Sequence, residues 1–476
     1  MSQTAYRPHH ATEVTEALVG QKVTLAGWVD RRRDHGGVAF IDLRDSTGLV
    51  QVVIYDEDMA RPLRSEFVIQ ITGEVRLRPD GNENTHLATG KIEVVAETIE
   101  ILAKSDALPF QVSTALENES ENKLPGEDVR LKYRYLDLRR PSMQYNLKLR
   151  SDMAKAARHA LEDMDFTEVE TPTFIKSTPE GARDFVVPAR LVPGSWYALP
   201  QSPQLLKQLL MVSGVERYYQ LARCYRDEDF RADRQPEFTQ LDMEMAYVDQ
   251  EDVMAMTEKV IAAIWKSAGY EVQLPLPRIT WKDAMDKYGS DKPDLRIDLT
   301  VTDATEALGA CGFGPFEGNT VKAVVVTGFE GTRKQVDKLC ADVEVQSGEK
   351  AYWFRYDENG EIVGGIAKFV QPVKDAVVAA LGLEKGCFVG LTAGKLLAAQ
   401  KAAGVLRSKL GAFCPNHMDK ERYEFCWIVD FPMYEIGEES GLLEFCHNPF
   451  SMPNGGLEIL KKAAAGEVDP LSITAF

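Results

Sequence analysis

The sequence predicts a multidomain α+β protein that begins with a small β-barrel, and three observations lead to this fold class. The chain has 476 residues, of which 44% are hydrophobic and 27% charged, so it is globular and too long for a single core. Residues 17–100 contain five short segments in which apolar and polar side chains alternate, as they do in strands. From residue 146 onward, segments of helical periodicity are interspersed with further alternating segments, which predicts helices and sheet together.

The five strand-like segments at the start of the chain predict a barrel of the OB type. They are residues 22–29, 38–44, 49–54, 67–75 and 91–96. Arg31, Arg32 and Arg33 cluster near the first of them, and Phe40 follows. Arginines can contact phosphates and an aromatic ring can stack on a base, so these residues predict a single-stranded nucleic-acid site. The alternative is an ordinary barrel that holds Phe40 in its core.

Composition excludes several classes of protein. No apolar run approaches the ~20 residues that span a bilayer, and the N-terminus MSQTAYRPHHATEV lacks the apolar region of a signal peptide. The seven cysteines are scattered without a CxxC pair, which fits a reduced, cytoplasmic compartment and argues against a zinc site of cysteines. The net charge of −18 argues against indiscriminate binding of polyanions, although a local basic patch can still bind RNA.

A polar connector, residues 103–143, separates the barrel from the next domain. An amphipathic helix is expected over residues 146–164. Residues 166–174 then alternate and include Pro172, which cannot donate to a ladder and therefore favours an edge or interface strand. A helix followed by such a strand is consistent with a dimer interface.

A second helix is expected to start at Pro203, which suits the first helical position, with Ser202 as its cap. Gln204 and Lys207 lie three residues apart and share a face, while the four leucines within residues 205–210 are expected to form the buried side. Lys207 can bind a substrate carboxylate as a point charge. The alternative is an ordinary solvated lysine.

Residues 226–244 place a charged loop between two strand-like segments, 218–225 and 238–245. The second segment alternates strictly, which puts an aromatic ring, an amide and two carboxylates on one face: Phe238, Gln240, Asp242 and Glu244. Arg226 and Glu228 join them from the neighbouring strand. This face is a plausible seat for a nucleotide and a cationic substrate group, whereas the alternative is a half-solvated hairpin without a ligand.

Four segments carry a family resemblance: LKYRYLDLRRP (131–141), STPEGARD (177–184), LPQSPQLLKQLLM (199–211) and RDEDFRADRQPEFTQ (226–240). They closely resemble bacterial aspartyl-tRNA synthetases, a class II family, and the resemblance extends over nearly the whole chain. It implies an OB-fold anticodon-binding domain, a class II catalytic domain built on an antiparallel sheet, and an inserted α+β domain. The implied limits are 1–108 for the anticodon domain, 109–140 for a hinge, 141–291 and 416–476 for the two catalytic parts, and 292–415 for the insertion.

The resemblance also implies a reaction in two steps, in which aspartate and ATP form aspartyl-adenylate and the aspartyl group is then transferred to tRNA. Arg226 would act as the catalytic residue on the α-phosphate, Glu228 would contact the adenine, Phe238 would stack beneath it, and Gln240 would complete the ATP site. Such chemistry needs charge placed where the transition state develops it, and it needs no protein nucleophile. Mg²⁺ would bridge the phosphates. No metal ligand is assigned within this chain.

For aspartate, the resemblance implies six binding residues: Glu180, Ser202, Gln204, Lys207, Asp242 and His447. Lys207 would bind the side-chain carboxylate, and Glu180 would lie on a loop that closes over the amino acid. Family members often carry a second histidine where this chain has Asn448, so a role that requires two imidazoles is in doubt.

For tRNA, the resemblance implies an anticodon pocket lined by Arg33, Phe40, Gln51, Asn82 and Glu93. His35 and Gly81 resemble the residues of non-discriminating enzymes, which charge tRNA-Asn as well as tRNA-Asp. Discrimination of the last anticodon base requires only ~1–3 kcal/mol, so two side chains can decide it. The expected partners are these tRNAs, ATP, L-aspartate and a second copy of the chain, with no membrane.

The end of the chain departs from the family pattern, because no glycine-rich third motif precedes Phe476. If the chain ends there, adenylation is expected to be severely reduced; if it continues, the enzyme remains the expectation. Two alternatives stay open. One is a truncated, non-catalytic module that binds tRNA or dimerises, and the other is an asparaginyl-tRNA synthetase. Lys207 argues against the latter, since a cation facing a neutral carboxamide would lose its ionic partner.

Overall fold

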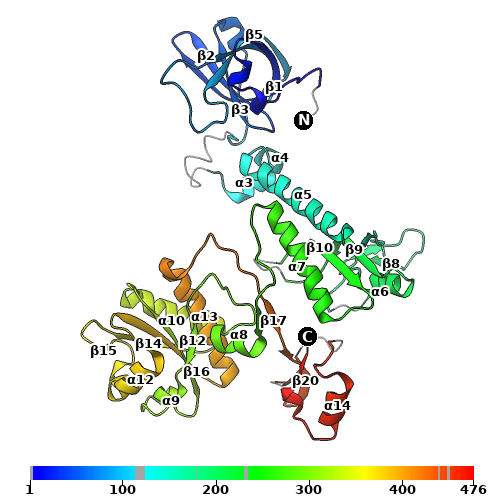
Figure 1. The fold of residues 1–476 in the computed structure, drawn as a ribbon. Coiled ribbons are helices and arrows are strands. Elements are labelled where there is room, and N and C mark those ends of the chain that lie inside the picture. The colour runs from blue at the N-terminus through cyan, green and yellow to red at the C-terminus, as the bar shows by residue number, and fades with distance from the viewer. Residues whose placement is uncertain are drawn as a thin grey trace. The chain divides into compact units, whose positions relative to one another are not determined.

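The computed structural model describes residues 4–112, 124–178, 181–229, 234–437, 440–446 and 451–475. The chain divides into two compact units, residues 1–159 and 160–476. Each is described by itself, with its elements labelled in Figure 1. Within the described residues, no helix combines the length and the apolar character needed to cross a membrane.

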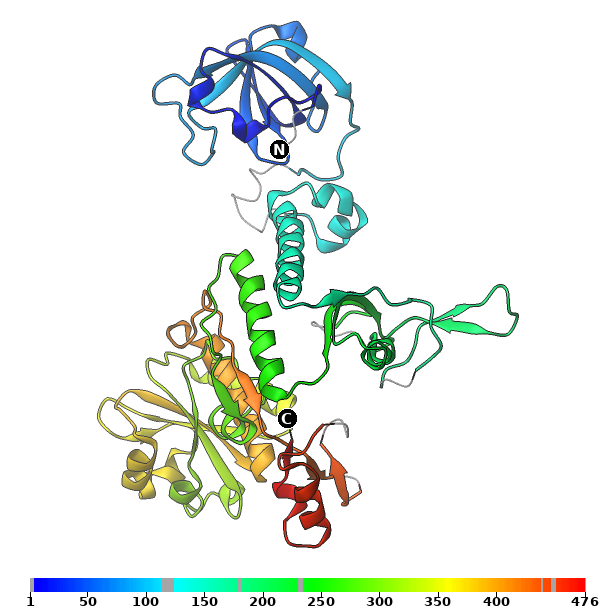
Figure 2. The ribbon, with the colours of Figure 1, turned by 45° about the vertical axis from the view of Figure 1, so that its right-hand side comes forward.

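Five strands of the first unit form a closed barrel in the order β1-β2-β3-β5-β4 (Figure 2). They are β1 (Lys22–His35), β2 (Val38–Arg44), β3 (Leu49–Ile54), β4 (Val68–Leu77) and β5 (Ile92–Ala103), with a short helix α1 (Glu57–Ala60). All ladders are antiparallel except the one between β3 and β5. Alternate apolar side chains fill the interior, among them Leu25, Ile41 and Val52. The predicted OB barrel is confirmed.

Three helices follow the barrel in the first unit: α3 (Glu127–Lys132), α4 (Arg134–Asp137) and α5 (Pro141–Glu162). The buried carboxylate of Asp137 accepts hydrogen bonds from Arg134 and Arg140, which fixes the turn before α5. The first half of α5 exposes Tyr145 and Leu147, and its last turn continues into the second unit.

The second unit begins with a three-stranded sheet in the order β10-β9-β6. Its elements are β6 (Thr167–Glu168), β9 (Arg217–Tyr225) and β10 (Glu237–Met245), with the helices α6 (Gln204–Val212) and α7 (Gln250–Ser267). β9 and β10 are antiparallel, as predicted. One face of β10 packs Leu241, Met243 and Met245 on a core centred on Tyr219. The alternation in residues 238–245 therefore separates core from polar face as the sequence predicted.

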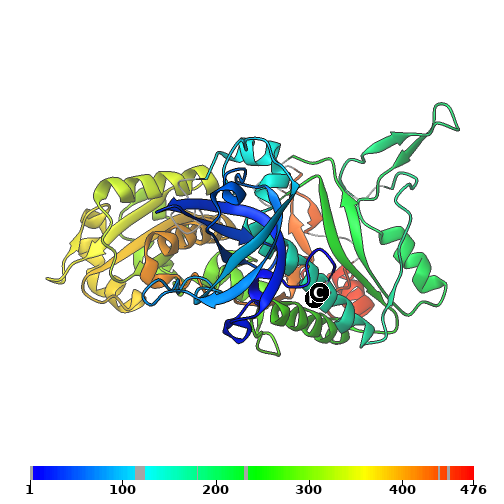
Figure 3. The same ribbon diagram turned by 90° about the horizontal axis from the view of Figure 1, so that it is seen from above.

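The strand expected over residues 166–174 is much shorter in the structure. Only β6 pairs, in parallel with β9, and Pro172 lies beyond it. The backbone N–H of Thr171 donates to the side chain of Gln220 instead of the backbone of β9, so the ladder has ended before Pro172, which has no N–H to extend it. A hairpin of β7 (Val186–Pro188) and β8 (Trp196–Ala198) projects from this part of the unit in two views (Figures 2 and 3).

A second sheet has the order β12-β13-β16-β14-β15 and is covered by helices on both faces. Its strands are β12 (Val301–Asp303), β13 (Thr320–Val326), β14 (Ala351–Tyr356), β15 (Ile362–Val363) and β16 (Cys387–Gly394). One face packs on α10 (Arg333–Ser347) and α13 (Leu396–Phe413), and the other on α9 (Thr305–Leu308), α11 (Ala367–Val370) and α12 (Lys374–Leu381). These elements fall inside the range predicted for the insertion.

Helix α8 (Trp281–Tyr288), which follows β11 (Arg278–Thr280), meets α13 backbone to backbone. A Cβ on Gly404 would lie 2.3 Å from the carbonyl oxygen of Gly289, so only glycine allows this approach. Arg407 is 1% exposed and donates to three backbone oxygens within residues 294–299, which anchors that segment to α13.

The last part of the second unit consists of short elements. β17 (Trp427–Val429) pairs in parallel with β11, β18 (Phe431–Pro432) pairs with β21 (Thr474–Ala475), and β19 (Tyr434–Ile436) pairs with β20 (Leu443–Phe445). Helix α14 (Gly456–Ala464) packs Ile459 and Leu460 on a small core with Met433 and Ile473.

Candidate functional site

The polar face of the β9–β10 hairpin carries the predicted nucleotide residues. The guanidinium of Arg226 lies over the ring of Phe238, 5.1 Å from its centroid, and its Nε donates to the backbone oxygen of Gln201 at 3.4 Å. One face of the aromatic ring is therefore covered by a cation. Gln240 follows on the same face and accepts a hydrogen bond from the thiol of Cys224 at 3.2 Å.

Glu228 lies in the loop after β9 and is exposed. Its carboxylate pairs with Arg234 at 3.3 Å, so the two ends of the loop are joined by an ion pair. Asp227 pairs with Arg183 at 3.6 Å, and its backbone N–H donates to the Arg183 carbonyl. The segment before β7 is thus attached to the loop that carries Glu228.

Lys207 is buried, with 8% of the residue exposed. Its Nζ contacts Asp242 Oδ1 at 2.7 Å and Glu244 Oε2 at 3.2 Å. Burial alone would lower the pKa of Lys207, but the hydrogen bonds and charges of Asp242 and Glu244 raise it above its ordinary value. The ammonium is therefore fixed in its charged form, and the alternative of a solvated surface lysine is wrong.

The helix that carries Lys207 buries a different face from the one that the sequence predicted. Leu205 and Leu209 are more than half exposed, and the lysine occupies the inner face in their place. The ion pairs with β10 hold that face inward. Helix α6 begins at Gln204 with Pro203 at its N-cap, and the Ser202 hydroxyl accepts from the Gln204 N–H at 3.3 Å, so the predicted cap is off by one position.

Asp242 has one carboxylate oxygen to spare. Its Oδ1 accepts from Lys207, whereas Oδ2 is buried and has no hydrogen-bond partner among the described residues. The hydroxyl of the neighbouring Tyr218 donates a hydrogen bond to Gln220 Oε1 at 2.8 Å. Burial and the charge of Asp242 raise the pKa of Tyr218, which keeps the phenol neutral. A buried acceptor without a donor is costly, so this oxygen is suited to a cationic or N–H ligand.

One residue that sequence reasoning missed is Gln201, which is 2% exposed. Its amide donates to and accepts from the backbone of Ala182, and it also donates to Asp184. It therefore anchors one end of the segment that was expected to close over the amino acid. The position of this glutamine, directly before the predicted cap Ser202, was the feature of the sequence that could have identified it. Glu180 and His447, together with Asn448, lie outside the described residues.

The barrel presents a second polar face, built from β1, β2, β3 and β5. Arg33 donates to Asp42 at 2.7 Å and to Gln51 at 3.3 Å, and Gln51 donates to Glu93 at 2.8 Å. Phe40 pairs with Arg33 across the strands and is half-buried, while its neighbours Ala39 and Ile41 point into the core. The alternative with Phe40 in the core is therefore wrong.

Two arginines of β4 and its end complete this face and were missed. Arg76 pairs with Glu93 at 2.8 Å, and Arg78 is 8% exposed with one guanidinium nitrogen, Nη2, unpartnered among the described residues. Burial lowers the pKa of Arg78 and raises the pKa of Asp42, despite the opposing charge of Arg33 on the latter. Arginine and apolar residues alternate over residues 75–78, and this pattern could have predicted that both arginines lie on the polar face.

The remaining residues predicted for the anticodon site are exposed. His35 ends β1 at a turn formed by Gly36 and Gly37, and Asn82 follows Gly81 in the loop after β4. Gly81 has φ +82°, so a side chain there would strain the backbone. The structure leaves both specificity candidates, His35 and Gly81, open to solvent.

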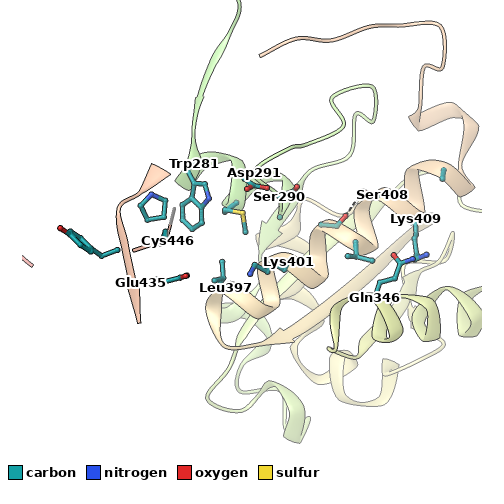
Figure 4. A pocket seen from close by; sticks show the side chains of 17 residues that line it. Trp281, Ser290, Asp291, Gln346, Leu397, Lys401, Ser408, Lys409, Glu435 and Cys446 are labelled. Atoms are coloured by element: carbon teal, nitrogen blue, oxygen red, sulfur yellow. Dashed lines mark hydrogen bonds between the residues drawn. The ribbon is translucent and has the colours of Figure 1, made fainter. Parts of the chain in front are cut away.

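A cavity of about 700 Å³ lies between α8, α13 and the segment of β18 and β19 (Figure 4). Lys401 and Lys409 line it from α13, and Asp291 and Glu435 offset their charge. Burial, with the nearby Glu435, raises the pKa of Cys446 at its edge to about 11. The ATP and aspartate residues that the structure describes do not line this cavity, so it does not locate their site.

The described residues contain no group of three or more histidine, cysteine, aspartate or glutamate side chains that could hold a metal ion. We therefore assign no metal ligand among them.

Comparison with family models adds to this geometry. A model described as tRNA synthetases class II (D, K and N) matches residues 126–471, which is more than half of the chain. The chain belongs to the class II tRNA synthetases. A second model, described as an OB-fold nucleic acid binding domain, matches residues 23–102, which is the barrel of this synthetase.

Curated relatives of the synthetase share most of its length. A protein of Bifidobacterium longum, named aspartate–tRNA(Asp/Asn) ligase, is 73% identical over 465 residues, covering 95% of this chain and 78% of that protein. A protein of the same name from Corynebacterium diphtheriae is 50% identical, covering 91% and 72%. A solved synthetase structure from Leishmania major superposes with a TM-score of 0.50 at 18% identity, covering 89% and 96%, and this likeness concerns the fold alone.

Proposed function

We propose that this synthetase is an aspartate–tRNA ligase, which activates L-aspartate with ATP and transfers it to tRNA-Asp. The relatives at 73% and 50% identity carry that activity in their names, and their names include tRNA-Asn. The structural observation that carries the proposal is the buried ammonium of Lys207, held by two carboxylates on the polar face of β10.

The charges around Lys207 suit a substrate with both an ammonium and a carboxylate. An ammonium has three N–H donors, and two of those of Lys207 already meet Asp242 and Glu244, which leaves one for the side-chain carboxylate of aspartate. The free Oδ2 of Asp242 would receive the substrate ammonium. Ser202 and Gln204 would contact the main chain of the amino acid. Glu180 and His447 join this set from the resemblance alone.

Asparagine fits this arrangement less well than aspartate. A carboxamide is neutral, so it would leave the remaining donor of the buried cation without an ionic partner. The preference for aspartate over asparagine therefore depends on Lys207. No contact of Lys207 favours the alternative of an asparaginyl-tRNA synthetase.

ATP is proposed to bind on the same hairpin. Arg226 would leave the face of Phe238 to contact the α-phosphate, and the adenine would take its place on the ring. Glu228 would then accept from the adenine amino group, with Gln240 beside it. The aspartate carboxylate attacks the α-phosphorus and pyrophosphate leaves, so the protein supplies position and charge instead of a nucleophile. Mg²⁺ is proposed to accompany the phosphates of ATP, without a protein ligand assigned to it.

The barrel is proposed to bind the anticodon. Phe40 would stack on a base, Gln51 and Glu93 would read base edges, and Arg33 and Asn82 would complete the pocket. The half-buried ring beside the Arg33–Gln51–Glu93 chain of hydrogen bonds supports this assignment.

We also propose a cytoplasmic homodimer with the domain limits given above, in which residues 292–415 are the insertion. The exposed apolar side chains at the start of α5 support an interface there.

The activity is tested by aspartate-dependent ATP–pyrophosphate exchange. Lys207→Gln should reduce the exchange at least a hundredfold, because a buried ionic contact made to the substrate is worth about 3 kcal/mol or more. Gln208→Ala changes an exposed neighbour on the same helix and should leave the rate unchanged. A Lys207→Gln variant that folds and exchanges at the wild-type rate would disprove the assignment.

A further inference from the structure

A network of four charged side chains, three of them buried, connects the barrel to the turn before α5. Arg44 donates to Asp30 and binds Glu66 through both carboxylate oxygens, at 2.8 and 2.7 Å. Arg139 then reaches the same Glu66 carboxylate at 2.6 Å. Asp30, Arg44 and Glu66 are each 5% exposed or less, and the two acids balance the two cations. Three of the four belong to the barrel, so Arg139 is the only one supplied from outside it.

The backbone around Glu66 is strained to hold this carboxylate. Glu66 has φ +65°, a left-handed conformation that is unfavourable for a residue with a side chain. Its N–H is also fixed, by donation to the Val29 carbonyl at 2.7 Å. Strain of this kind persists where the surrounding contacts require it, and here they direct a carboxylate toward two guanidinium groups.

Trp28 adds a second contact between Arg139 and the barrel. The guanidinium of Arg139 lies 5.5 Å from the centre of its ring, and that of Arg44 lies 6.0 Å from it. Arg139 therefore contacts the barrel in two ways, by an ion pair to a buried acid and by a cation–π contact. An arginine can make both at once because its planar guanidinium presents a face and an edge, whereas a lysine cannot.

Arg139 stands two residues before α5, the helix that continues into the synthetase part of the chain. We propose that Arg139 is a positioning residue for tRNA: it fixes the barrel to the start of α5, so that a tRNA bound at the barrel is held at a defined position for the rest of the enzyme. This inference depends on the proposed function. Contacts made at two ends of one tRNA strengthen each other to a degree set by the length and stiffness of the connection between their sites, so restraining this connection in a suitable geometry raises the affinity.

The test compares the binding of two RNAs to the full chain, a whole tRNA-Asp transcript and the isolated anticodon hairpin. For Arg139→Gln, the hairpin should bind within twofold of wild type, because the barrel retains the Arg44–Glu66 pair. The whole tRNA should bind about fivefold more weakly or worse, because the second set of contacts loses its restraint. Arg139→Lys keeps the charge but loses the fork geometry and should lie between the two.

Arg130→Gln is the matched control, since Arg130 lies in α3 and donates to the Pro125 carbonyl, not to the barrel. It should bind both RNAs as wild type does. The inference is overturned if Arg139→Gln binds whole tRNA like wild type, or if Arg139→Gln and Arg139→Lys weaken hairpin and whole tRNA equally, which would place the effect inside the barrel. A wild-type chain that binds neither RNA would contradict the proposed function instead, so the two failures are distinguishable.

Discussion

At the scale of single residues, Phe40 offers a direct test of the nucleic-acid face, because its ring lies outside the barrel core. Stacking of one base on an aromatic ring is worth ~1–3 kcal/mol. Phe40→Leu keeps an apolar side chain but removes the flat ring, so binding of the anticodon hairpin should weaken by about tenfold. A filter-binding titration at fixed salt concentration measures this.

The stability of the barrel provides the control for Phe40. A half-buried position should tolerate leucine at a cost of ~1 kcal/mol or less, so thermal unfolding should change little. Tyr6→Ala removes an exposed aromatic ring elsewhere in the same unit and should leave hairpin binding unchanged. If wild type and Phe40→Leu bind the anticodon hairpin with equal affinity, Phe40 does not stack on a base and the assignment is wrong.

Individual residues also show where sequence patterns stop being informative. The alternation over 238–245 predicted the polar face of β10 correctly, because one side of a strand must meet the core. The same reasoning misjudged α6, where Leu205 and Leu209 are exposed and Lys207 is buried. Apolar periodicity identifies a face that avoids water, but it does not say whether this chain covers that face. The ion pairs to Asp242 and Glu244 depend on residues 35 and 37 positions away, which no local pattern reveals.

At the scale of elements, the β9–β10 hairpin and the positions of the barrel strands were predicted correctly, because their side chains alternate between a core and a polar surface, but β1 and β5 extend to His35 and Ala103, beyond the predicted ends at residues 29 and 96. β6 was overestimated: the alternation of residues 166–174 continues past Glu168, where the strand ends, to a proline that could not have extended it. Helix α5 begins five residues earlier than expected, because Pro141 takes its first position. Local rules predict the type of an element better than its ends.

Helix α5 carries the prediction at this scale. Leu147 is half exposed near its start, and an interface between two copies would cover it. Leu147→Glu would bury a charge in that interface, so the 53.1 kDa chain should change from a dimer to a monomer in light scattering. Val345→Glu introduces the same charge at a highly exposed position of α10 and should leave the dimer intact. A wild-type chain that is monomeric at micromolar concentration would contradict the proposed homodimer.

At the scale of the whole molecule, the proposed function assigns the choice between tRNAs to the barrel and the chemistry to the second unit. tRNA-Asp and tRNA-Asn are distinguished by the last anticodon base, and a protein separates two such substrates by the difference between its affinities for them. Rejection of the wrong base requires a group that clashes with it or leaves it unpaired. The described structure presents an exposed His35 and an exposed glycine at 81, and a glycine has no side chain with which to exclude a base.

The chain should therefore charge tRNA-Asn at a rate within about tenfold of tRNA-Asp, because neither position supplies a group that rejects the base, whereas one discriminating contact would be worth ~1–3 kcal/mol, or about 5- to 150-fold. The measurement uses two transcripts that differ only in the last anticodon base, so that every other contact is matched. Lys207→Gln should abolish the charging of both transcripts, because it acts on the amino acid. Phe40→Leu should weaken the binding of both transcripts by the same factor, because the ring of Phe40 stacks on a base without reading base edges. A rate for the tRNA-Asn transcript a hundredfold or more below that of its partner would show that this synthetase discriminates, and that His35 and Gly81 do not leave the pocket permissive.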